Sequence, residues 1–251
     1  MAPVNSTALP TRLNKEPLLD VLFEIRFTSQ HPVSNILPGI LFSRFPHCRM
    51  EQLPQSQLPQ ILRQQSPELK YAPLVRLVGE QYAYQVGDNS FSISSLMPYK
   101  GWQHFKNEIL ESIEILKIAS LVDTVERFSL KYIDLIEHSG PEKSEILNVA
   151  LQIGERDFAT SNYQVHTELS HEDMTALIQI ISSAKVQTPN APDRHGIVVD
   201  IDTIFQAGGE SLAGLSDLFA NKLDRVHALN KDVFFSTLSS RAIELLEPIY
   251  D

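Results

Sequence analysis

The stretch FSISSLMPYKGWQHFKNEILESIEILKIASLVDTVERFSLKYIDLIEH, residues 91–138, decides the fold that the sequence predicts. Its apolar residues first alternate with serines, then recur every three or four positions, and then alternate again. Period two is typical of a strand with one buried face, and spacings of three and four are typical of an amphipathic helix. The stretch therefore predicts a strand, a proline turn, a helix and a long strand, and the stripe of the helix consists of Trp102, Phe105, Ile109, Ile113 and Leu116.

The residues before this stretch supply the other half of one motif. Leu19–Phe27 alternates and predicts a strand, and Val33–Phe45 predicts a helix. Leu74–Val78 and Tyr82–Val86 predict two strands or one bent strand, which forms a hairpin with the strand at Phe91. The order β-α-β-β-α-β is the signature of the split βαβ (ferredoxin-like) sandwich, an antiparallel sheet with two helices on one face. An α+β domain of this kind is therefore expected over residues 17–138.

Two segments of the N-terminal half lack this periodicity. Residues 1–16 contain no apolar run of the kind found in secretory signals, and we expect them to form a disordered leader. Residues 46–73 repeat proline and glutamine and predict a polar connector with one short helix around Pro59–Gln65. A connector of this length is expected to be functional or mobile.

The C-terminal half predicts a second, smaller α+β unit over residues 143–251, after a boundary at Gly140–Pro141. The run Met174–Ile181 favours a strand in a hairpin that turns at Ser170–Asp173, because it is rich in Thr and Ile. The alternative is a helix that opens with a capping box at the same turn. The other elements expected here are strands at Tyr163–Leu169 and Gly196–Ile204, a helix with the stripe Leu212, Leu215, Phe219, Leu223 and Val226, and a short helix at Ala242–Leu246.

Charge is distributed unevenly along the 251 residues. Residues 1–138 contain 13 Lys and Arg against 14 Asp and Glu, whereas residues 139–251 contain 8 against 17, so that nearly all of the net charge of −10 lies in the second half. Such a surface repels phosphate backbones, and nucleic-acid binding through residues 139–251 is not expected. It favours a basic protein partner, with simple solubility as the alternative.

The sequence contains few features that would indicate a membrane-spanning helix or a disulfide. No apolar run approaches the roughly 18 residues that a membrane-spanning helix needs, so no membrane partner is expected. Cys48 is the only cysteine and excludes an intrachain disulfide. Cytoplasmic localisation follows as the expectation.

A pair of carboxylates is the candidate metal site. Asp200 and Asp202 lie on one face of the predicted strand GIVVDIDTI, and Glu168 lies on a neighbouring predicted strand. Three carboxylates that converge can hold a hard cation such as Mg²⁺, which would support metal-dependent hydrolysis of a phosphate ester. The alternative is the polar face of a half-exposed strand, and no other cofactor is expected.

Other chemistry-bearing residues give weaker signals. His166 and His171 are five residues apart, which is not the spacing of a zinc pair on a helix, so a structural or surface role is favoured. His47 and Cys48 lie in the connector without the pattern of a known nucleophile.

Three aromatic residues at the start of the central helix form another candidate group. Tyr99, Trp102 and Phe105 could form an aromatic platform for a ligand, although their helical spacing is more typical of core packing.

Six segments resemble a sporadically distributed bacterial family of similar length and unknown function. They are PLLDVLFEIRF, VGDNSFSIS, PYKGWQHFKNEIL, VERFSLKYIDLIE, VVDIDT and HALNKDVFFSTLS. The resemblance covers most of the chain after Pro17, is weakest in the connector, and departs at Ser239–Ser240, where an aspartate at a helix start would match. It implies no active site, and its patchy distribution is similar to that of accessory, defence or toxin–antitoxin genes.

The sequence as a whole predicts a non-catalytic cytoplasmic protein that binds another protein, in an antitoxin-like or defence-accessory role. This prediction depends on the absence of a catalytic motif and on the acidic second half. Two alternatives stay open: a metal-dependent enzyme that uses Asp200 and Asp202, and a small-ligand sensor with a pocket between the two halves.

Overall fold

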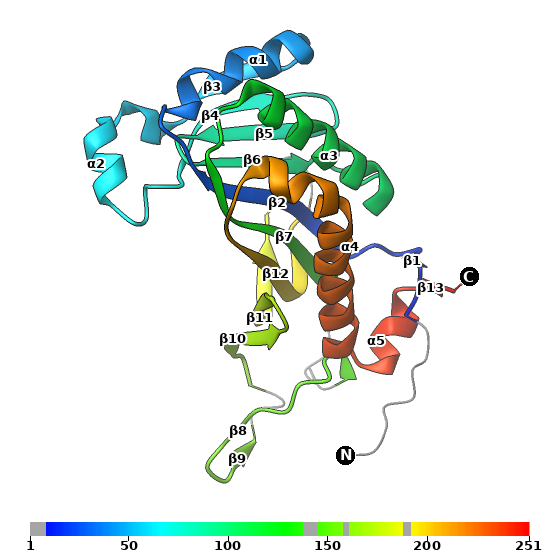
Figure 1. The fold of residues 1–251 in the computed structure, drawn as a ribbon. Coiled ribbons are helices and arrows are strands. Elements are labelled where there is room, and N and C mark those ends of the chain that lie inside the picture. Colours follow the sequence, from blue (N-terminus) through cyan, green and yellow to red (C-terminus); the bar gives the residue numbers. More distant parts are fainter. Residues whose placement is uncertain (1–8, 138–144, 158–160, 188–191, 251) are drawn as a thin grey trace.

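One antiparallel sheet of nine strands runs through the whole chain in the computed structural model, which describes residues 9–137, 145–157, 161–187 and 192–250. The strand order is β10-β11-β12-β7-β2-β6-β5-β4-β3, and every neighbouring pair is antiparallel. The sheet twists strongly between its two ends, as antiparallel sheets of this size do (Figure 1). Its strands are β2 (Leu18–Thr28), β3 (Arg49–Gln52), β4 (Pro73–Val78), β5 (Tyr82–Gly87), β6 (Ser90–Ser95), β7 (Thr124–Glu137), β10 (Gln164–His171), β11 (Met174–Val186) and β12 (Arg194–Glu210).

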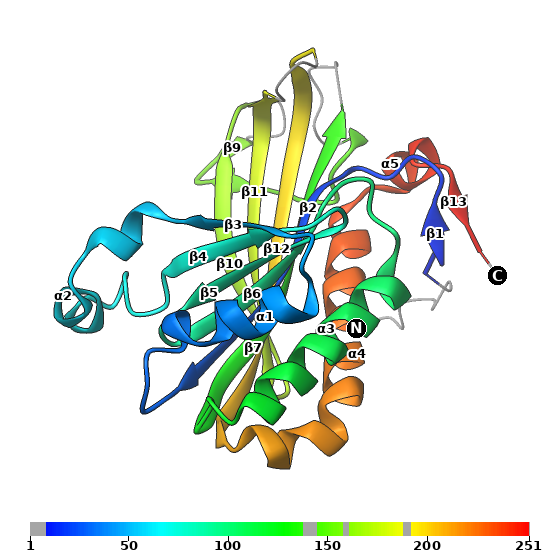
Figure 2. The same cartoon turned by 90° about the horizontal axis from the view of Figure 1, so that it is seen from above.

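The three longest helices cover one face of this sheet (Figures 1 and 2). We call it the helix face and the opposite one the open face. The helices are α1 (Leu37–Arg44), α2 (Gln60–Gln65), α3 (Trp102–Ala119), α4 (Leu212–Thr237) and α5 (Ser240–Leu245), with 3₁₀ turns η1 (Val33–Asn35) and η2 (Pro54–Gln57). Two further strand pairs are short: β1 (Arg12–Leu13) with β13 (Pro248–Ile249), and β8 (Gln152–Ile153) with β9 (Arg156–Asp157).

The core lies between the sheet and the helices α1, α3 and α4. Alternate residues of β2 and β7 point into it, as period two requires, and Phe23, Phe128 and Leu130 are fully buried. The ring of Phe219 from α4 packs against both phenylalanines, at 6.2 and 4.8 Å between centroids. Phe205 of β12 stacks on Phe128 at 5.0 Å, so the core is continuous across the two halves of the chain.

The predicted elements are largely confirmed. The strand, helix and hairpin predictions of residues 17–137 correspond to β2, α1, β4, β5, β6, α3 and β7, and the short helix of the connector is α2. The run at Met174–Ile181 is strand β11, in a hairpin with β10, so the helix alternative is wrong.

The predicted division into two separate units is wrong. β12 pairs with β7 over most of its length, from Gly196↔Glu137 to Gln206↔Arg127, so that β10, β11 and β12 extend the sheet of the first half. The predicted boundary around residues 138–142 lies outside the described residues. Alternation shows that a strand has two faces, but not which strand pairs with it, and this pairing joins residues far apart in the sequence.

Two other expectations need correction. Part of the predicted leader is ordered: Pro10 is buried, and Arg12 and Leu13 pair with Ile249 and Pro248. The connector contains an edge strand, β3, which pairs with β4. Both pairings depend on distant residues, and neither segment alternates clearly. Residues 1–8 lie outside the described residues.

Candidate functional site

A cavity of about 550 Å³ lies on the helix face, and we call it the strap pocket. Its walls are the strap (residues 10–18), the start of α3, the strand β7 and the second half of α4. β1 of the strap is held by β13, and Lys15 forms an ion pair with Glu247 at 2.8 Å. The strap therefore forms one side of the cavity, and residues near the C-terminal end of the described chain hold it in place.

The sequence periods place the pocket residues. Tyr132 and Asp134 follow Phe128 and Leu130 at steps of two along β7, so they point to the helix face. On α4, residues 227, 230, 231 and 234 lie on one side of the helix because they are three, one and three positions apart.

Asp134 is a buried carboxyl group at the wall of the pocket. It is 7 % exposed and makes no hydrogen bond or ion pair with any other described residue. Burial, together with the nearby carboxylates of Asp200 and Glu16, raises its pKa to about 8. At neutral pH the group is therefore largely protonated, and it becomes a carboxylate readily if a cation reaches it.

Aromatic side chains form a connected row beside Asp134. The hydroxyl of Tyr132 lies 3.3 Å from the hydroxyl of Tyr99 and 3.3 Å from Nδ1 of His227. His227 stacks on Trp102 with centroids 4.0 Å apart. Phe234 of α4 adds a further ring to the lining.

The polar ends of this row have defined protonation states. Burial lowers the pKa of His227 to about 4, and the charge of Lys231 acts in the same direction, so the imidazole is neutral at pH 7. Burial also raises the pKa of Tyr132 and Tyr99. The aromatic wall therefore carries no charge at neutral pH.

Lys231 is a further ionisable group of the pocket without an ion pair among the described residues. It is half-buried, burial lowers its pKa, and it forms no ion pair with a described residue. Nearby lysines differ from it, because Lys106 contacts Asp224 at 2.6 Å and Lys15 contacts Glu247. Lys100 lies at the exposed rim, also without an ion pair to a described residue.

Asn230 fixes α4 to the sheet at the floor of the pocket. Its Nδ2 lies 3.2 Å from the carbonyl oxygen of Leu130, 2.9 Å from that of Ile201 and 3.1 Å from Oγ1 of Thr203. The side chain is 3 % exposed. A buried amide bonded to two strands holds the helix in one position over them.

The residues of the predicted metal site meet on the open face. Asp200, Asp202 and Glu168 line one hollow of about 320 Å³ together with Lys131 and His166, and we call it the acidic hollow. Period two and the register of β10, β11 and β12 place these side chains on the same face of the sheet, although β11 lies between the strand of Glu168 and the strand of Asp200 and Asp202. The cluster of three carboxylates stays a prediction.

The acidic hollow already contains a cation of the protein itself. Nζ of Lys131 lies 2.8 Å from Oδ2 of Asp200. Burial raises the pKa of Asp202, against the opposing effects of Ser129, Arg127 and Lys131. Among the residues described, no group of three or more His, Cys, Asp and Glu side chains is arranged to hold a metal ion. The Mg²⁺ site stays a prediction, and the lysine contact favours the polar-face alternative.

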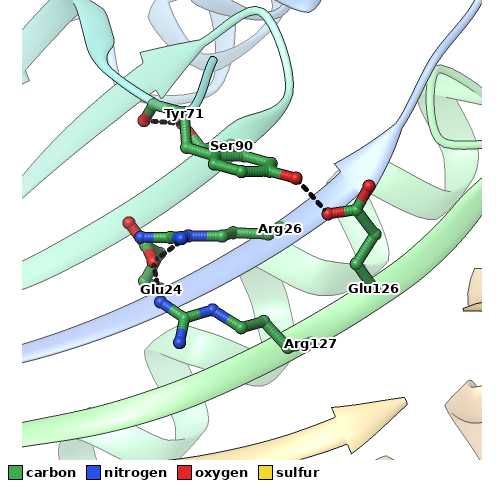
Figure 3. Close-up of polar contacts among 6 residues, drawn as sticks. All are labelled: Glu24, Arg26, Tyr71, Ser90, Glu126 and Arg127. Carbon is green, nitrogen blue, oxygen red and sulfur yellow. Dashed lines mark hydrogen bonds and ion pairs between the residues drawn. The ribbon is translucent and has the colours of Figure 1, made fainter. Parts of the chain in front are cut away.

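A network of paired charges continues along the open face (Figure 3). Oε1 of Glu24 lies 2.6 Å from Nε of Arg26 and 3.1 Å from Nη2 of Arg127. The guanidinium of Arg26 lies over the ring of Tyr71, whose hydroxyl donates a hydrogen bond to Glu126. The charges of this network are therefore paired within the protein.

The remaining predicted groups do not converge on a site. Cys48 is buried, and burial raises the pKa of its thiol, which disfavours the reactive thiolate. His166 and His171 lie on opposite faces of β10, because they are an odd number of residues apart. Phe105 is buried in the core, whereas Tyr99 and Trp102 line the strap pocket.

Comparisons with known proteins give no further assignment. No family model matches the chain, and no curated protein matches it. The family resemblance drawn from the six segments therefore stays a prediction.

Sequence reasoning missed the role of Asp134 and Lys231 as pocket residues without a partner among the described residues. Asp134 lies in the alternating run KYIDLIE at a position where period two predicts an inward side chain, so a charged residue on the core face was a readable signal. Lys231 gave no such signal, because it is the position of α4 relative to β7 that brings it to the pocket.

Proposed function

We propose that the chain is a small-ligand-binding protein and that its ligand occupies the strap pocket. The observation that carries the proposal is Asp134, a buried carboxyl group without a partner among the described residues, at the wall of a cavity of about 550 Å³. Ligand pockets are typically apolar hollows of this size with a few polar groups that fix the orientation of the ligand. A buried carboxyl group without a partner costs stability, and a ligand that pairs with it offsets this cost.

Occlusion of the cavity tests the proposal. Leu18→Trp places a large ring in the pocket, and Leu62→Trp on the exposed side of α2 is the matched control. Each protein is incubated with a metabolite extract and washed by ultrafiltration, and the retained small molecules are identified by mass spectrometry. We expect wild type and Leu62→Trp to retain a compound that Leu18→Trp does not. Equal retention by all three, or no retention by wild type, contradicts the proposal.

A protein-binding role is the second candidate, and the connector supports it. Ile61 and Leu62 on α2 are 63 % and 51 % exposed, and Leu58 before the helix is also exposed. The helix projects from the β3–β4 edge of the sheet (Figure 2). Exposed apolar side chains that cluster often mark contact sites for other proteins. An antitoxin-like or defence-accessory function is one version of this candidate.

The apolar side of α2 can be tested directly. Ile61→Asp combined with Leu62→Asp should abolish recovery of a stoichiometric partner in a pull-down from the native host, while the double variant Gln64→Asp and Gln65→Asp should not. If no partner is recovered with wild type, or if both variants recover it equally, α2 is not the contact site.

We also propose a finer description of the fold and location. The neighbouring strands β7-β2-β6-β5, with α1 and α3 as the connections, have the order of a split βαβ unit, which supports the ferredoxin-like prediction for this part of the sheet. None of the described helices is long and apolar enough to cross a membrane. A cytoplasmic location is proposed from the single cysteine, which lies buried and unpaired.

A further inference from the structure

We propose that the strap pocket takes an amphoteric aromatic ligand, with a cationic nitrogen that pairs with Asp134 and an anionic group that pairs with Lys231. This inference rests on the proposed ligand-binding function and specifies the class of ligand. Its chemistry is that of a small zwitterion built on a ring, such as an aromatic amino acid.

The cationic end follows from Asp134. Its oxygens have no hydrogen-bond donor among the described residues, although the side chain is more than nine-tenths buried. The neighbouring polar groups Tyr99, Tyr132 and His227 contact each other instead. A ligand ammonium group would supply both the donors and the counter-charge that the carboxyl group lacks, and hydrogen bonds between such charged groups are the strong ones.

The anionic end follows from Lys231 and the rim beside it. The ammonium group of Lys231 is half-buried without a carboxylate partner among the described residues, whereas Lys106, one turn into α3, is paired with Asp224. Lys100 and the start of α3 border the same cavity. The first turn of this 18-residue helix has no side-chain cap and no acidic residue, so its N–H groups and its dipole favour an anion there.

The two charges act as a pair only through a ligand. Asp134 on β7 and Lys231 on α4 have opposite formal charges and line one cavity, yet no ion pair joins them. A ligand with a single charge would satisfy one group and leave the other unpaired, and this is the basis of discrimination at polar sites. A ligand with both charges satisfies the two together.

The aromatic ring of the proposed ligand is inferred from the side chains that line the cavity. Tyr99, Trp102, Tyr132 and Phe234 line the cavity, and the His227 imidazole that stacks on Trp102 is neutral at pH 7. Rings pack favourably against such walls in offset or edge-to-face arrangements.

Three probes with one ring separate the contributions. L-tryptophan has both charges, tryptamine has only the amine and indole-3-propionate has only the carboxylate. Isothermal titration calorimetry of the full chain at pH 7 measures their affinities. We expect L-tryptophan to bind at least about tenfold more tightly than either single-charge probe, because each charged contact is worth about that factor.

Charge-neutral variants assign each end of the probe. Asp134→Asn should weaken L-tryptophan and tryptamine about tenfold and leave indole-3-propionate unchanged, and Lys231→Gln should weaken L-tryptophan and indole-3-propionate but not tryptamine. Asp232→Asn and Lys117→Gln, on outward positions of α4 and α3, are the matched controls and should change none of the affinities. Thermal unfolding of each variant shows that it is folded, and a merely structural role of either residue would weaken all three probes alike.

The outcomes separate this inference from the function on which it rests. Equal affinities for the three probes, the absence of binding by all of them, or variants that fail to distinguish amine from carboxylate overturn the amphoteric ligand. The retention experiment with Leu18→Trp is independent of these probes. A retained compound that lacks either charge also overturns the inference but leaves the ligand-binding function supported.

Discussion

The strap pocket and the acidic hollow lie on opposite faces of the sheet and share strand β7. Along β7, Tyr132 and Asp134 point to the pocket, while Lys131 between them points to the hollow. On the open face the carboxylate of Asp200 is paired with Lys131 at 2.8 Å. On the helix face the carboxyl group of Asp134 has no partner among the described residues.

The comparison favours the strap pocket over the acidic hollow as the proposed ligand site, because the carboxyl group of Asp134 has no partner among the described residues. Three carboxylates line the acidic hollow, where Lys131 pairs with Asp200 and Oδ1 of Asp202 is buried without a hydrogen-bond partner among the described residues. In the strap pocket a single carboxyl group is buried, and the cost of its burial has no visible offset within the protein. Four predictions test this contrast, beginning with the largest expected effect.

The largest difference in unfolding free energy is expected between leucine-to-alanine substitutions on the two faces. Leu130→Ala on the helix face removes a fully buried side chain and should lower the free energy of unfolding by about 2–5 kcal/mol. Leu22→Ala on the open face, where the side chain is half-buried, should cost about 1 kcal/mol. Urea denaturation followed by circular dichroism measures both. Equal losses would show that the open face is covered as completely as the helix face.

Asp134 should make stability depend on pH in the opposite sense to an ordinary paired aspartate. Its pKa of about 8 in the folded chain lies above the value of 3.8 for an unburied group, so its contribution is fully present below pH 4 and is lost as the pH rises towards 8. We expect Asp134→Asn to gain stability relative to wild type by a few kcal/mol between pH 5 and pH 8. The exposed Asp232→Asn is the control, and a difference that stays constant with pH would refute the buried, unpartnered state.

His227 should make the stability of the folded chain depend on pH in the acidic range. Its pKa of about 4 lies below the ordinary value of 6.5, so its contribution is present above pH 6.5 and is lost as the pH falls towards 4. His227→Gln should therefore lose less stability than wild type between pH 6.5 and pH 4.5, by on the order of 2 kcal/mol. His166→Gln in the acidic hollow is the matched variant. Thermal unfolding across this range distinguishes the two.

The ion pair of the acidic hollow should have the smallest effect. Lys131→Gln removes the contact with Asp200, and because both groups are partly exposed the expected loss is about 1 kcal/mol or less. Because salt screens exposed charges, 1 M salt should reduce the difference in unfolding free energy between variant and wild type. A loss of several kcal/mol that is insensitive to salt would mean that the ion pair is shielded from solvent.

Local patterns predicted most of the elements. The alternation of Leu19–Phe27 and the stripe from Trp102 to Leu116 gave β2 and α3 within a residue or two, because period and packing face are properties of neighbouring residues. The pairing of β12 with β7 and of β1 with β13 was not predictable in this way, since each joins residues far apart in the sequence. The same limit led to the incorrect division into two units.

The candidate site was predictable only in part. Alternation placed Asp200 and Asp202 on one face of their strand, and both line the acidic hollow with Glu168, but the sequence did not show that β11 lies between β10 and β12. Tyr99 and Trp102 were considered as a ligand platform, but their third member, Phe105, belongs to the core. The strap pocket depends on how α4 and the strap pack against the sheet. No local sequence pattern predicts this packing.

The amide of Asn230 gives α4 a pivot near the middle of the sheet. Two strand carbonyls and a threonine hydroxyl hold this one turn of a 26-residue helix. We expect any tilt of the helix to occur about this point. His227 and Lys231, on either side of Asn230, would then move together. Backbone amides around Asn230 should then exchange with deuterium more slowly than those at either end of α4. A ligand that shifts His227 would also shift Lys231.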